Sequence, residues 1–211
     1  MKKELIINKS NTIIVILAGG QSRRFGGGYK TLYKLNNISI LDRIIQNFKK
    51  LKMELVLNVN SNEDQFLKTG LHLIKDELKN FQGPLAGIHS SMKWVLANKK
   101  NIEWIFTSPS DTPFLSKSLV NKFLSTNYNN KTNIVIAKSF NKTHPVIGLW
   151  HISLIKCLEE FLATNNRKIM HWVEQQNYEF LNFEYKNYFF NINTQADLVE
   201  AIKIEKILKK I

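Results

Sequence analysis

The 211-residue sequence contains a single cysteine and no long apolar stretch. With Cys157 alone, the chain can form no internal disulfide and no metal site built from several thiolates, which fits a reducing compartment. No apolar run approaches the roughly 20 residues that span a bilayer. The apolar segment near the start is interrupted by polar residues 8–11, before it reaches the length of a signal peptide. We therefore expect a cytoplasmic protein with no membrane partner.

Acidic residues are also scarce, with 17 Asp and Glu against 30 Lys and Arg, which gives a formal net charge of +13. Such a charge is compatible with nucleic acid, a membrane surface or an anionic small molecule as partner. The lysines are scattered, and no predicted helix interleaves basic and aromatic residues as nucleic-acid surfaces do, although residues 203–210 are locally basic. We expect no nucleic-acid partner and keep a basic nucleic-acid-binding module as an alternative.

A proline- or glycine-rich linker, an internal repeat and a low-complexity tract are absent as well. Hydrophobic residues make up 44% of the chain and charged residues 22%, which is typical of a folded globular protein. We therefore expect one domain over residues 1–211.

The chain contains an alternation of predicted strands and helices. A β-branched run at 12–20 predicts a buried strand, and an apolar stripe at 39–51, with Ser39 as N-cap, predicts a helix. The alternation predicts an α/β protein: a three-layer α/β/α sandwich with a mostly parallel, Rossmann-like sheet. Further strands are expected at 53–60, 71–76, 103–111, 133–138, 145–150, 178–183 and 188–193, and further helices at 62–70, 83–100, 116–124, 152–162, 167–176 and 194–210.

The loop after the first strand, ILAGGQSRRFGGGYK at 16–30, combines five glycines with Arg23, Arg24 and Lys30. In open α/β sheets, ligands bind beyond the carboxyl ends of the strands. Glycines let backbone N–H groups approach an anion, and the cations neutralise phosphate oxygens, so the loop predicts a polyphosphate site. The alternative is a flexible glycine turn with solvated cations.

Two familiar phosphate-binding motifs are excluded by spacing. Tyr29 stands where a P-loop has glycine directly before its lysine. Thr31 stands where the dinucleotide-binding fingerprint has its third glycine. The loop is therefore of another type.

LAGGQSRRFGG together with Lys30 resembles the L-A-G-G-x-S-x-R-M-G-G-x-x-K loop of nucleotidyltransferases related to the sugar-nucleotide enzymes, in particular the molybdenum cofactor guanylyltransferases. Four more stretches continue the resemblance in order: DELKNFQGPLAGI at 76–88, SPSDTPF at 108–114, HPVIGLW at 144–150 and NINTQADL at 191–198. Two positions depart from the family pattern. Tyr29 replaces an Asp, which bears on the geometry of the phosphate loop, and Ser110 replaces a nearly isosteric Cys.

The resemblance implies a nucleotide-diphospho-sugar transferase type of fold and a guanylyl transfer. The phosphate of molybdenum-molybdopterin would attack the α-phosphorus of GTP, pyrophosphate would leave, and molybdopterin guanine dinucleotide would form with Mg²⁺ as cofactor. Contacts with recipient molybdoenzymes or with a chaperone are compatible with this activity. The alternatives are transfer from CTP, transfer to a sugar phosphate, and a catalytically silent relative that binds nucleotide.

The resemblance also implies roles for individual residues. Lys30 would bind the phosphates with help from Arg23, and Asp111 would bind Mg²⁺, so we expect these three to be catalytic. A single carboxylate suffices for Mg²⁺ when phosphates and water complete its shell. An Asx-turn or a helix cap near Ser116 is the alternative for Asp111. The residues expected to bind the nucleotide are Leu17, Ala18, Gly19, Gly20, Lys30, Asn58, Asp76, Gly83, Gly87 and Asp111.

Three expectations concern substrate recognition. The Asp76 carboxylate can accept the adjacent N–H donors of guanine, which adenine lacks. Asn58 is either a nucleotide ligand or a turn residue at the end of a strand, and the amides of the 83–87 turn can face an anion or a base. His144 and Asn193 lie in family-matched stretches and are expected in the pocket of the second substrate, but not as catalysts; a structural role is the alternative for His144, since a lone His before Pro is more often structural. No His–carboxylate pair is evident, as expected for a phosphate nucleophile that needs no general base.

Overall fold

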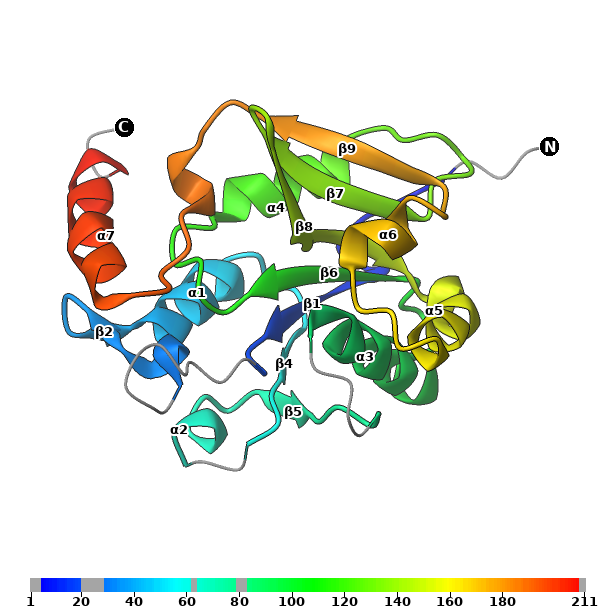
Figure 1. Cartoon of the computed structure of the whole chain (residues 1–211), viewed down its shortest axis with the longest axis horizontal. Coiled ribbons are helices and arrows are strands. Elements are labelled where there is room, and N and C mark those ends of the chain that lie inside the picture. The colour runs from blue at the N-terminus through cyan, green and yellow to red at the C-terminus, as the bar shows by residue number, and fades with distance from the viewer. Residues whose placement is uncertain (1–4, 20–28, 62–63, 79–82, 209–211) are drawn as a thin grey trace.

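A computed structural model describes residues 5–19, 29–61, 64–78 and 83–208 of the chain. Its centre is a sheet of seven described strands in the order β5-β4-β1-β6-β8-β7-β9 (Figure 1). Gly20 and Arg23 of the expected site lie outside the described residues. The strands are β1 (Thr12–Leu17), β4 (Leu55–Asn58), β5 (His72–Ile74), β6 (Trp104–Pro109), β7 (Ile134–Ser139), β8 (Lys142–His151) and β9 (Tyr178–Phe183).

Most strand pairs are parallel, as predicted. The strands β5, β4, β1 and β6 run in one direction, and within this seven-stranded sheet β8 alone of the described strands is antiparallel to both of its neighbours. In the register of the sheet, Leu17 at the end of β1 lies between Asn58 and Pro109. The carboxyl ends of three strands therefore meet at one edge, where ligands bind in open α/β sheets.

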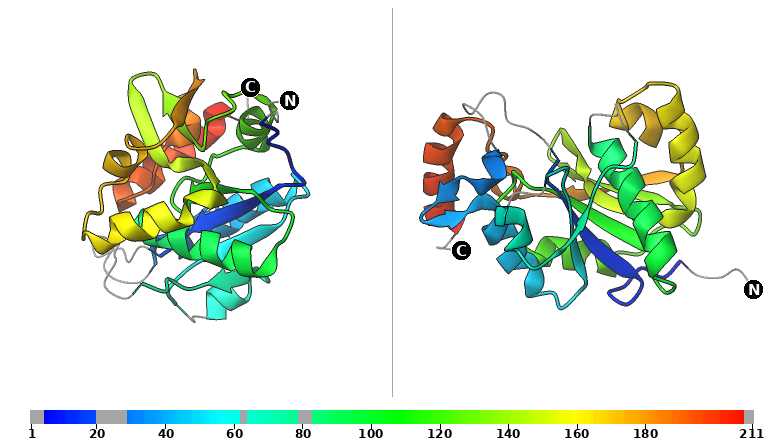
Figure 2. Two further views of the ribbon diagram at one scale, coloured as in Figure 1. Left: turned by 90° about the vertical axis from the view of Figure 1, so that its right-hand side faces the viewer. Right: turned by 90° about the horizontal axis from the view of Figure 1, so that it is seen from below.

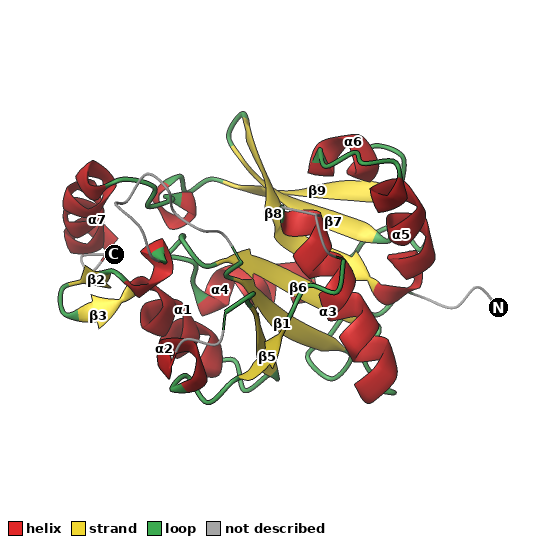
Figure 3. Cartoon of the chain, turned by 60° about the horizontal axis from the view of Figure 1, so that its bottom comes forward, coloured by secondary structure: helices red, strands yellow, loops and turns green. Residues whose placement is uncertain are grey.

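Helices cover both faces of the sheet, which confirms the three-layer prediction (Figures 2 and 3). Along β1, Ile14 and Ile16 belong to one apolar core, and Ile13 and Val15 belong to the other. A strand that is buried on both faces needs such a continuous apolar run. One face carries α1 (Ile40–Lys49), α2 (Asp64–Leu67), α4 (Lys117–Ser125) and α7 (Gln195–Leu208), and the other carries α3 (Pro84–Asn98), α5 (Ile155–Ala163) and α6 (Ile169–Val173).

The predicted starts of three helices are confirmed, two of them by side-chain caps. The Ser39 hydroxyl accepts a hydrogen bond from the amide of Asp42 at 2.9 Å, and the Thr194 hydroxyl accepts one from the amide of Asp197 at 3.2 Å. Pro84 occupies the first position of α3, where its missing N–H costs nothing. In the described parts of the chain, no helix combines the length and the apolar composition that a bilayer crossing needs.

The strand predicted at 188–193 is wrong. Residues Asn187–Phe189 form a 3-10 helix (η4), and the amide of Ile192 donates to the carbonyl of Asp111 at 2.9 Å. Phe189 is buried and stacks on the His144 ring with centroids 4.3 Å apart. Tertiary contacts with Asp111 and with His144 on β8 thus override the β propensity of this aromatic segment.

A short hairpin in the first half of the chain was not expected from the sequence. It consists of β2 (Lys34–Leu35) and β3 (Ile38–Ser39), directly after the 3-10 helix η2 (Lys30–Leu32). Its two turn residues, Asn36 and Asn37, have φ angles of 50° and 66°. Asparagine tolerates this left-handed conformation, which two-residue hairpin turns require.

Candidate active site

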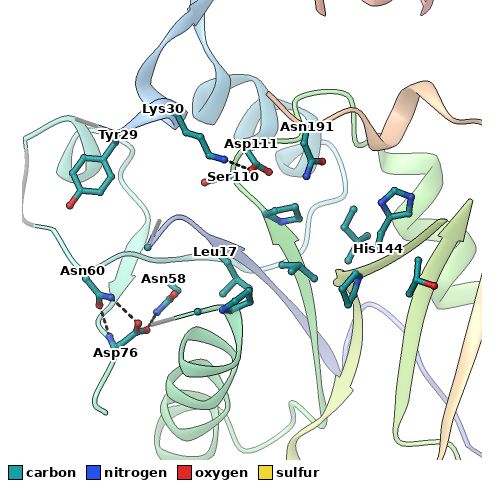
Figure 4. Close-up of a pocket in the computed structure, with 18 of the residues that line it drawn as sticks. Leu17, Tyr29, Lys30, Asn58, Asn60, Asp76, Ser110, Asp111, His144 and Asn191 are labelled. Atoms are coloured by element: carbon teal, nitrogen blue, oxygen red, sulfur yellow. Dashed lines mark hydrogen bonds and ion pairs between the residues drawn. The ribbon is translucent and has the colours of Figure 1, made fainter. Parts of the chain in front are cut away.

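A cleft of about 700 Å³ opens at the carboxyl ends of β1, β4 and β6 (Figure 4). One side of the cleft is the β8 wall, residues 142–147. The other side is the strand-end wall, which consists of Leu17, Gly19, Tyr29, Lys30, Asn58, Asn60, Asp76, Gly83, Pro84, Pro109, Ser110 and Asp111. Asn191, from the segment between η4 and α7, also lines the cleft. Of the residues expected to bind nucleotide, the cleft brings together Leu17, Gly19, Lys30, Asn58, Asp76, Gly83 and Asp111.

At one end of the strand-end wall, Lys30 and Asp111 form an ion pair, with Nζ and Oδ2 2.6 Å apart. The same Nζ donates to Oδ1 of Asn193 at 2.7 Å. The two charged side chains are only 19% and 14% exposed. Segments that are far apart in the sequence therefore place a cation and a carboxylate side by side, and the roles of Lys30 and Asp111 as phosphate and metal ligands stay predictions.

The surroundings of Asp111 fit a metal ion that arrives with a ligand. The described residues contain no group of three or more His, Cys, Asp or Glu side chains that could hold a metal alone. Neutral oxygens accompany Asp111, since the Thr112 hydroxyl contacts Oδ1 of Asp111 at 3.2 Å and Oδ1 of Asn191 at 2.8 Å. One carboxylate is the usual protein share of an Mg²⁺ site that also uses phosphates and water. Ser116 itself caps α4, so the helix-cap alternative for Asp111 is not observed.

At the other end of this wall, two asparagines hold the carboxylate of Asp76. Nδ2 of Asn58 donates to Oδ1 at 2.8 Å, and Nδ2 of Asn60 donates to Oδ2 at 2.7 Å. Asn58 is 2% exposed and also donates to the carbonyl of Ile74 at 3.2 Å, so it links β4 to β5 rather than forming a simple turn. Asn60 was not expected from the sequence. The Asn-x-Asn spacing was the available signal, because alternate residues of an extended chain point to the same side.

Backbone groups near Leu17 continue the sheet beyond the strands. The amide of Ala18 donates to the carbonyl of Asn58 at 2.8 Å, and the amide of Ser110 donates to the carbonyl of Leu17 at 3.1 Å. Ala18 is buried, and its contact with a nucleotide stays a prediction. The contact of Ser110 uses its backbone, so the replacement of Cys by Ser at this position leaves it unchanged.

The two glycines expected from the 83–87 turn differ in their surroundings. Gly83 precedes α3 with a φ of 138°, a conformation that favours glycine, and it lines the cleft. Gly87 lies in the first turns of α3, where an added Cβ would be 2.3 Å from Oδ1 of Asn58. Gly87 therefore lets α3 approach Asn58 closely.

Tyr29, which departs from the family pattern, lines the cleft beside Lys30. Its ring meets that of Phe66 on α2 edge to face, with centroids 5.0 Å apart. An aromatic contact of this kind stabilises by about 0.5–1.5 kcal/mol beyond the buried area. Tyr29, which directly precedes Lys30, thus packs against α2.

The β8 wall presents a neutral histidine. His144 is 8% exposed, and its Nε2 lies 2.8 Å from the Ser139 hydroxyl. Burial, together with the charge of Lys142, lowers the pKa of His144 to about 4. The ring is therefore uncharged at neutral pH, and the Ser139 hydroxyl and the Phe189 ring hold it in place.

Comparison with known proteins identifies relatives over most of the chain. A model of the MobA-like NTP transferase domain matches residues 14–179. The molybdenum cofactor guanylyltransferase of Nitrobacter hamburgensis is 35% identical over 193 residues, which cover 90% of this chain and 92% of the relative. The proteins of the same name from Mesorhizobium japonicum and Yersinia pestis are 33% and 34% identical, and the matches cover 90% and 87% of this chain and 94% and 91% of theirs.

Solved structures share the fold. The molybdopterin-guanine dinucleotide biosynthesis protein A of Archaeoglobus fulgidus superposes with a TM-score of 0.72 at 22% identity, and the match covers 94% of this chain and 99% of that one. The 4-diphosphocytidyl-2C-methyl-D-erythritol synthase of Anaerococcus prevotii gives a TM-score of 0.71 at 14% identity, with coverage of 92% and 96%. At these identities the likeness supports the fold and does not distinguish the nucleotide.

Proposed function

This chain belongs to the MobA-like NTP transferase family, and we propose that it transfers GMP from GTP to the phosphate of molybdenum-molybdopterin. Relatives that are 33–35% identical over nine-tenths of the chain carry the name of that activity. The structural observation that carries the proposal is the Lys30–Asp111 pair, 2.6 Å apart, at the strand-end edge of the cleft. It supplies the cation and the carboxylate that a metal-dependent nucleotidyl transfer needs.

The reaction forms one P–O bond and breaks another. A phosphate oxygen of molybdenum-molybdopterin attacks the α-phosphorus of GTP, and the bond from that phosphorus to the oxygen bridging to the β-phosphate breaks, which releases pyrophosphate. A phosphate is already anionic near pH 7, so no general base is needed. The task of the protein is to align the two substrates and to stabilise the charge that develops on the leaving pyrophosphate.

Lys30 is the residue placed to stabilise that charge. Fixed cations accelerate a reaction when they hold the transition state more strongly than the ground state. The Lys30 ammonium and the Asp111 carboxylate neutralise each other in the structure. On binding, we propose that Lys30 turns to phosphate oxygens and that Asp111, with phosphates, holds Mg²⁺, which would supply further charge neutralisation there. Arg23 and Gly20 remain predicted participants in phosphate binding.

The group around Asp76 is the proposed site of the base. A carboxylate has about four acceptor positions, so Asp76 can accept from Asn58 and Asn60 and still bind two donors. Guanine presents adjacent N–H donors, whereas adenine does not. Figure 4 shows Asp76 and Lys30 on opposite sides of Leu17, as separate base and phosphate subsites require. Gly19 and Gly83 line the cleft beside them.

The β8 wall is the proposed site of the acceptor. It offers the neutral His144 and the less polar residues 145–147 to a heterocycle, and Lys142 to its anionic groups. Asn191 lies between His144 and Lys30 in the cleft (Figure 4), and Asn193 accepts a hydrogen bond from Lys30, so both are near the place where the acceptor phosphate would meet the α-phosphorus.

The decisive experiment incubates the purified protein with GTP, Mg²⁺ and molybdenum-molybdopterin. We expect pyrophosphate and a guanine dinucleotide of the cofactor, identified by mass spectrometry. Parallel reactions offer CTP, and UTP with a sugar phosphate, under the same conditions. A preference for CTP, or product only with the sugar phosphate, would overturn the guanylyl assignment.

A further inference from the structure

Asn60, beyond the end of β4, and Asp76, beyond the end of β5, form a reciprocal pair of hydrogen bonds (Figure 4). Nδ2 of Asn60 donates to Oδ2 of Asp76 at 2.7 Å, and Oδ1 of Asn60 accepts from the amide of Asp76 at 2.8 Å. We propose that Asn60 is a positioning residue, which orients the Asp76 carboxylate and thereby sets the preference for a purine with a 2-amino group. The inference rests on the guanylyltransferase function proposed above.

The geometry explains why one asparagine is not enough. The terminal torsion of an aspartate side chain is broad, so a carboxylate held at one oxygen can still rotate. Asn58 holds Oδ1 and Asn60 holds Oδ2, which together fix the carboxylate plane. Each oxygen keeps acceptor capacity, and the two adjacent donors of guanine bind together only when this plane is aligned with the base.

The chain around Asp76 has attachments that do not depend on Asn60. The amide of Glu77 donates to the Ser90 hydroxyl on α3 at 3.0 Å, and the Glu77 carboxylate pairs with Lys93. Asn60 is exposed in the cleft, in contrast to the buried Asn58. Removal of the Asn60 side chain is therefore expected to free the carboxylate without detaching the segment or unfolding the protein.

A direct role for Asn60 makes a different prediction. If its amide contacted the ribose or a phosphate, its loss would weaken all purine nucleotides alike. An orienting role acts only through the donors that Asp76 accepts, so it affects guanine more than a base that lacks one of them. Inosine triphosphate lacks the 2-amino group and otherwise matches GTP, which makes it the suitable comparison.

The test measures the Kd of GTP and of inosine triphosphate by calorimetry, with Mg²⁺ and the full chain. Asn60→Ala removes both hydrogen bonds. Asn60→Asp keeps the oxygen that accepts from the Asp76 amide, but it replaces the donor to Oδ2 with a carboxylate oxygen and adds a negative charge there. Asp76→Asn changes the base-reading group itself and sets the lower limit of selectivity. Asn98→Ala is the matched control, because Asn98 is an exposed asparagine on α3 with one side-chain bond, 2.8 Å to the carbonyl of Trp94.

We expect Asn60→Ala to weaken the binding of GTP about tenfold and that of inosine triphosphate about twofold or less. The tenfold change corresponds to the loss of one hydrogen bond between the base and the charged Asp76 carboxylate. The ratio of the two Kd values then falls toward that of Asp76→Asn in both Asn60 variants, and Asn98→Ala keeps the wild-type ratio. An unchanged ratio, or a thermal unfolding scan that shows Asn60→Ala unfolded, overturns the role of Asn60 but not the proposed function. A wild-type protein with no saturable GTP binding overturns the proposed function instead.

Discussion

The two walls of the cleft differ in the charge of the groups that they present. The strand-end wall carries the ammonium of Lys30 and the carboxylates of Asp111 and Asp76. Along the β8 wall, Lys142 is the one charged residue of 142–147, and His144 is held neutral. Charge is thus concentrated where a triphosphate and a metal ion would bind.

Within the strand-end wall, the two ends differ in how their charges are balanced. Lys30 and Asp111 neutralise each other, so both must exchange a partner when a ligand binds. Asp76 is instead held by neutral amides and can keep both while it accepts new donors. The end with Lys30 and Asp111, the proposed phosphate end, therefore suits charge stabilisation during the reaction. The end with Asp76, the proposed base end, suits a fixed geometry that selects the base.

Lys30→Ala should have the largest effect. Removing one preorganised group that stabilises developing charge lowers kcat roughly 10²–10³-fold. The loss should appear in turnover as well as in GTP binding, because the ammonium acts on the transition state. Pyrophosphate release in steady-state and single-turnover assays measures the two contributions.

The matched control for this change is Lys203→Ala on α7. Lys203 also pairs with a carboxylate, that of Glu200 at 3.0 Å, but it is 67% exposed and outside the cleft. The Lys203→Ala variant should release pyrophosphate at the wild-type rate. A Lys30 variant that only raised KM, with kcat intact, would show that Lys30 binds substrate and transition state equally, and would break the contrast between the two ends.

Asp111→Asn should have the next largest effect, roughly 10²-fold on the rate at saturating GTP, as for the loss of a key electrostatic group. The amide keeps an oxygen for Lys30 but lacks the charge that attracts Mg²⁺. Titration of the rate with Mg²⁺ should show a higher half-saturating concentration. Glu200→Gln is the control, and an unchanged Mg²⁺ dependence for Asp111→Asn would remove the metal from this end of the cleft.

The sequence predicts the parts of this cleft that depend on local patterns. Six buried residues in β1 and the Ser39 cap are local signals, and the structure bears them out. The family resemblance supplies Lys30 and Asp111, but their direct contact across 81 positions depends on how the strands align. The strand expected at 188–193 fails for the same reason, since the Ile192 amide bonds to Asp111. A local sequence pattern does not specify which distant segments come together or in what register.

Gly87→Ala tests whether close packing keeps the base end in place. The added Cβ would be 2.3 Å from Oδ1 of Asn58 and 2.9 Å from Cδ2 of Leu17. Overpacking typically costs about 1–3 kcal/mol, which exceeds the gain of about 1 kcal/mol from helix propensity. We expect a lower free energy of unfolding in urea and several-fold weaker GTP binding, because a displaced Asn58 releases Asp76.

Gly70→Ala separates the two effects of that substitution. Gly70 has a φ of +68° and no described atom within 4 Å of an added Cβ. It should lose about 1 kcal/mol through backbone strain and keep its affinity for GTP. Equal GTP binding by both variants would show that Asn58 does not transmit the packing of α3 to Asp76.

The smallest expected effect is a pH dependence of stability from His144 on the β8 wall. Burial is the main cause that lowers its pKa from 6.5 to about 4, so between these values the unfolded chain binds a proton that the folded chain does not. Stability should therefore fall as the pH is lowered, by about 1 kcal/mol between pH 7.5 and pH 5.5. Urea unfolding of His144→Gln should show a loss of stability between pH 7.5 and pH 5.5 that is smaller by this amount. His89 and His151, whose pKa values burial also lowers, should still contribute to the pH dependence in this variant. Ser139→Ala should lose stability at every pH and retain the pH dependence, because the burial of His144 remains. An equal pH dependence in wild type and His144→Gln would show that His144 binds a proton in the folded protein as readily as in the unfolded chain.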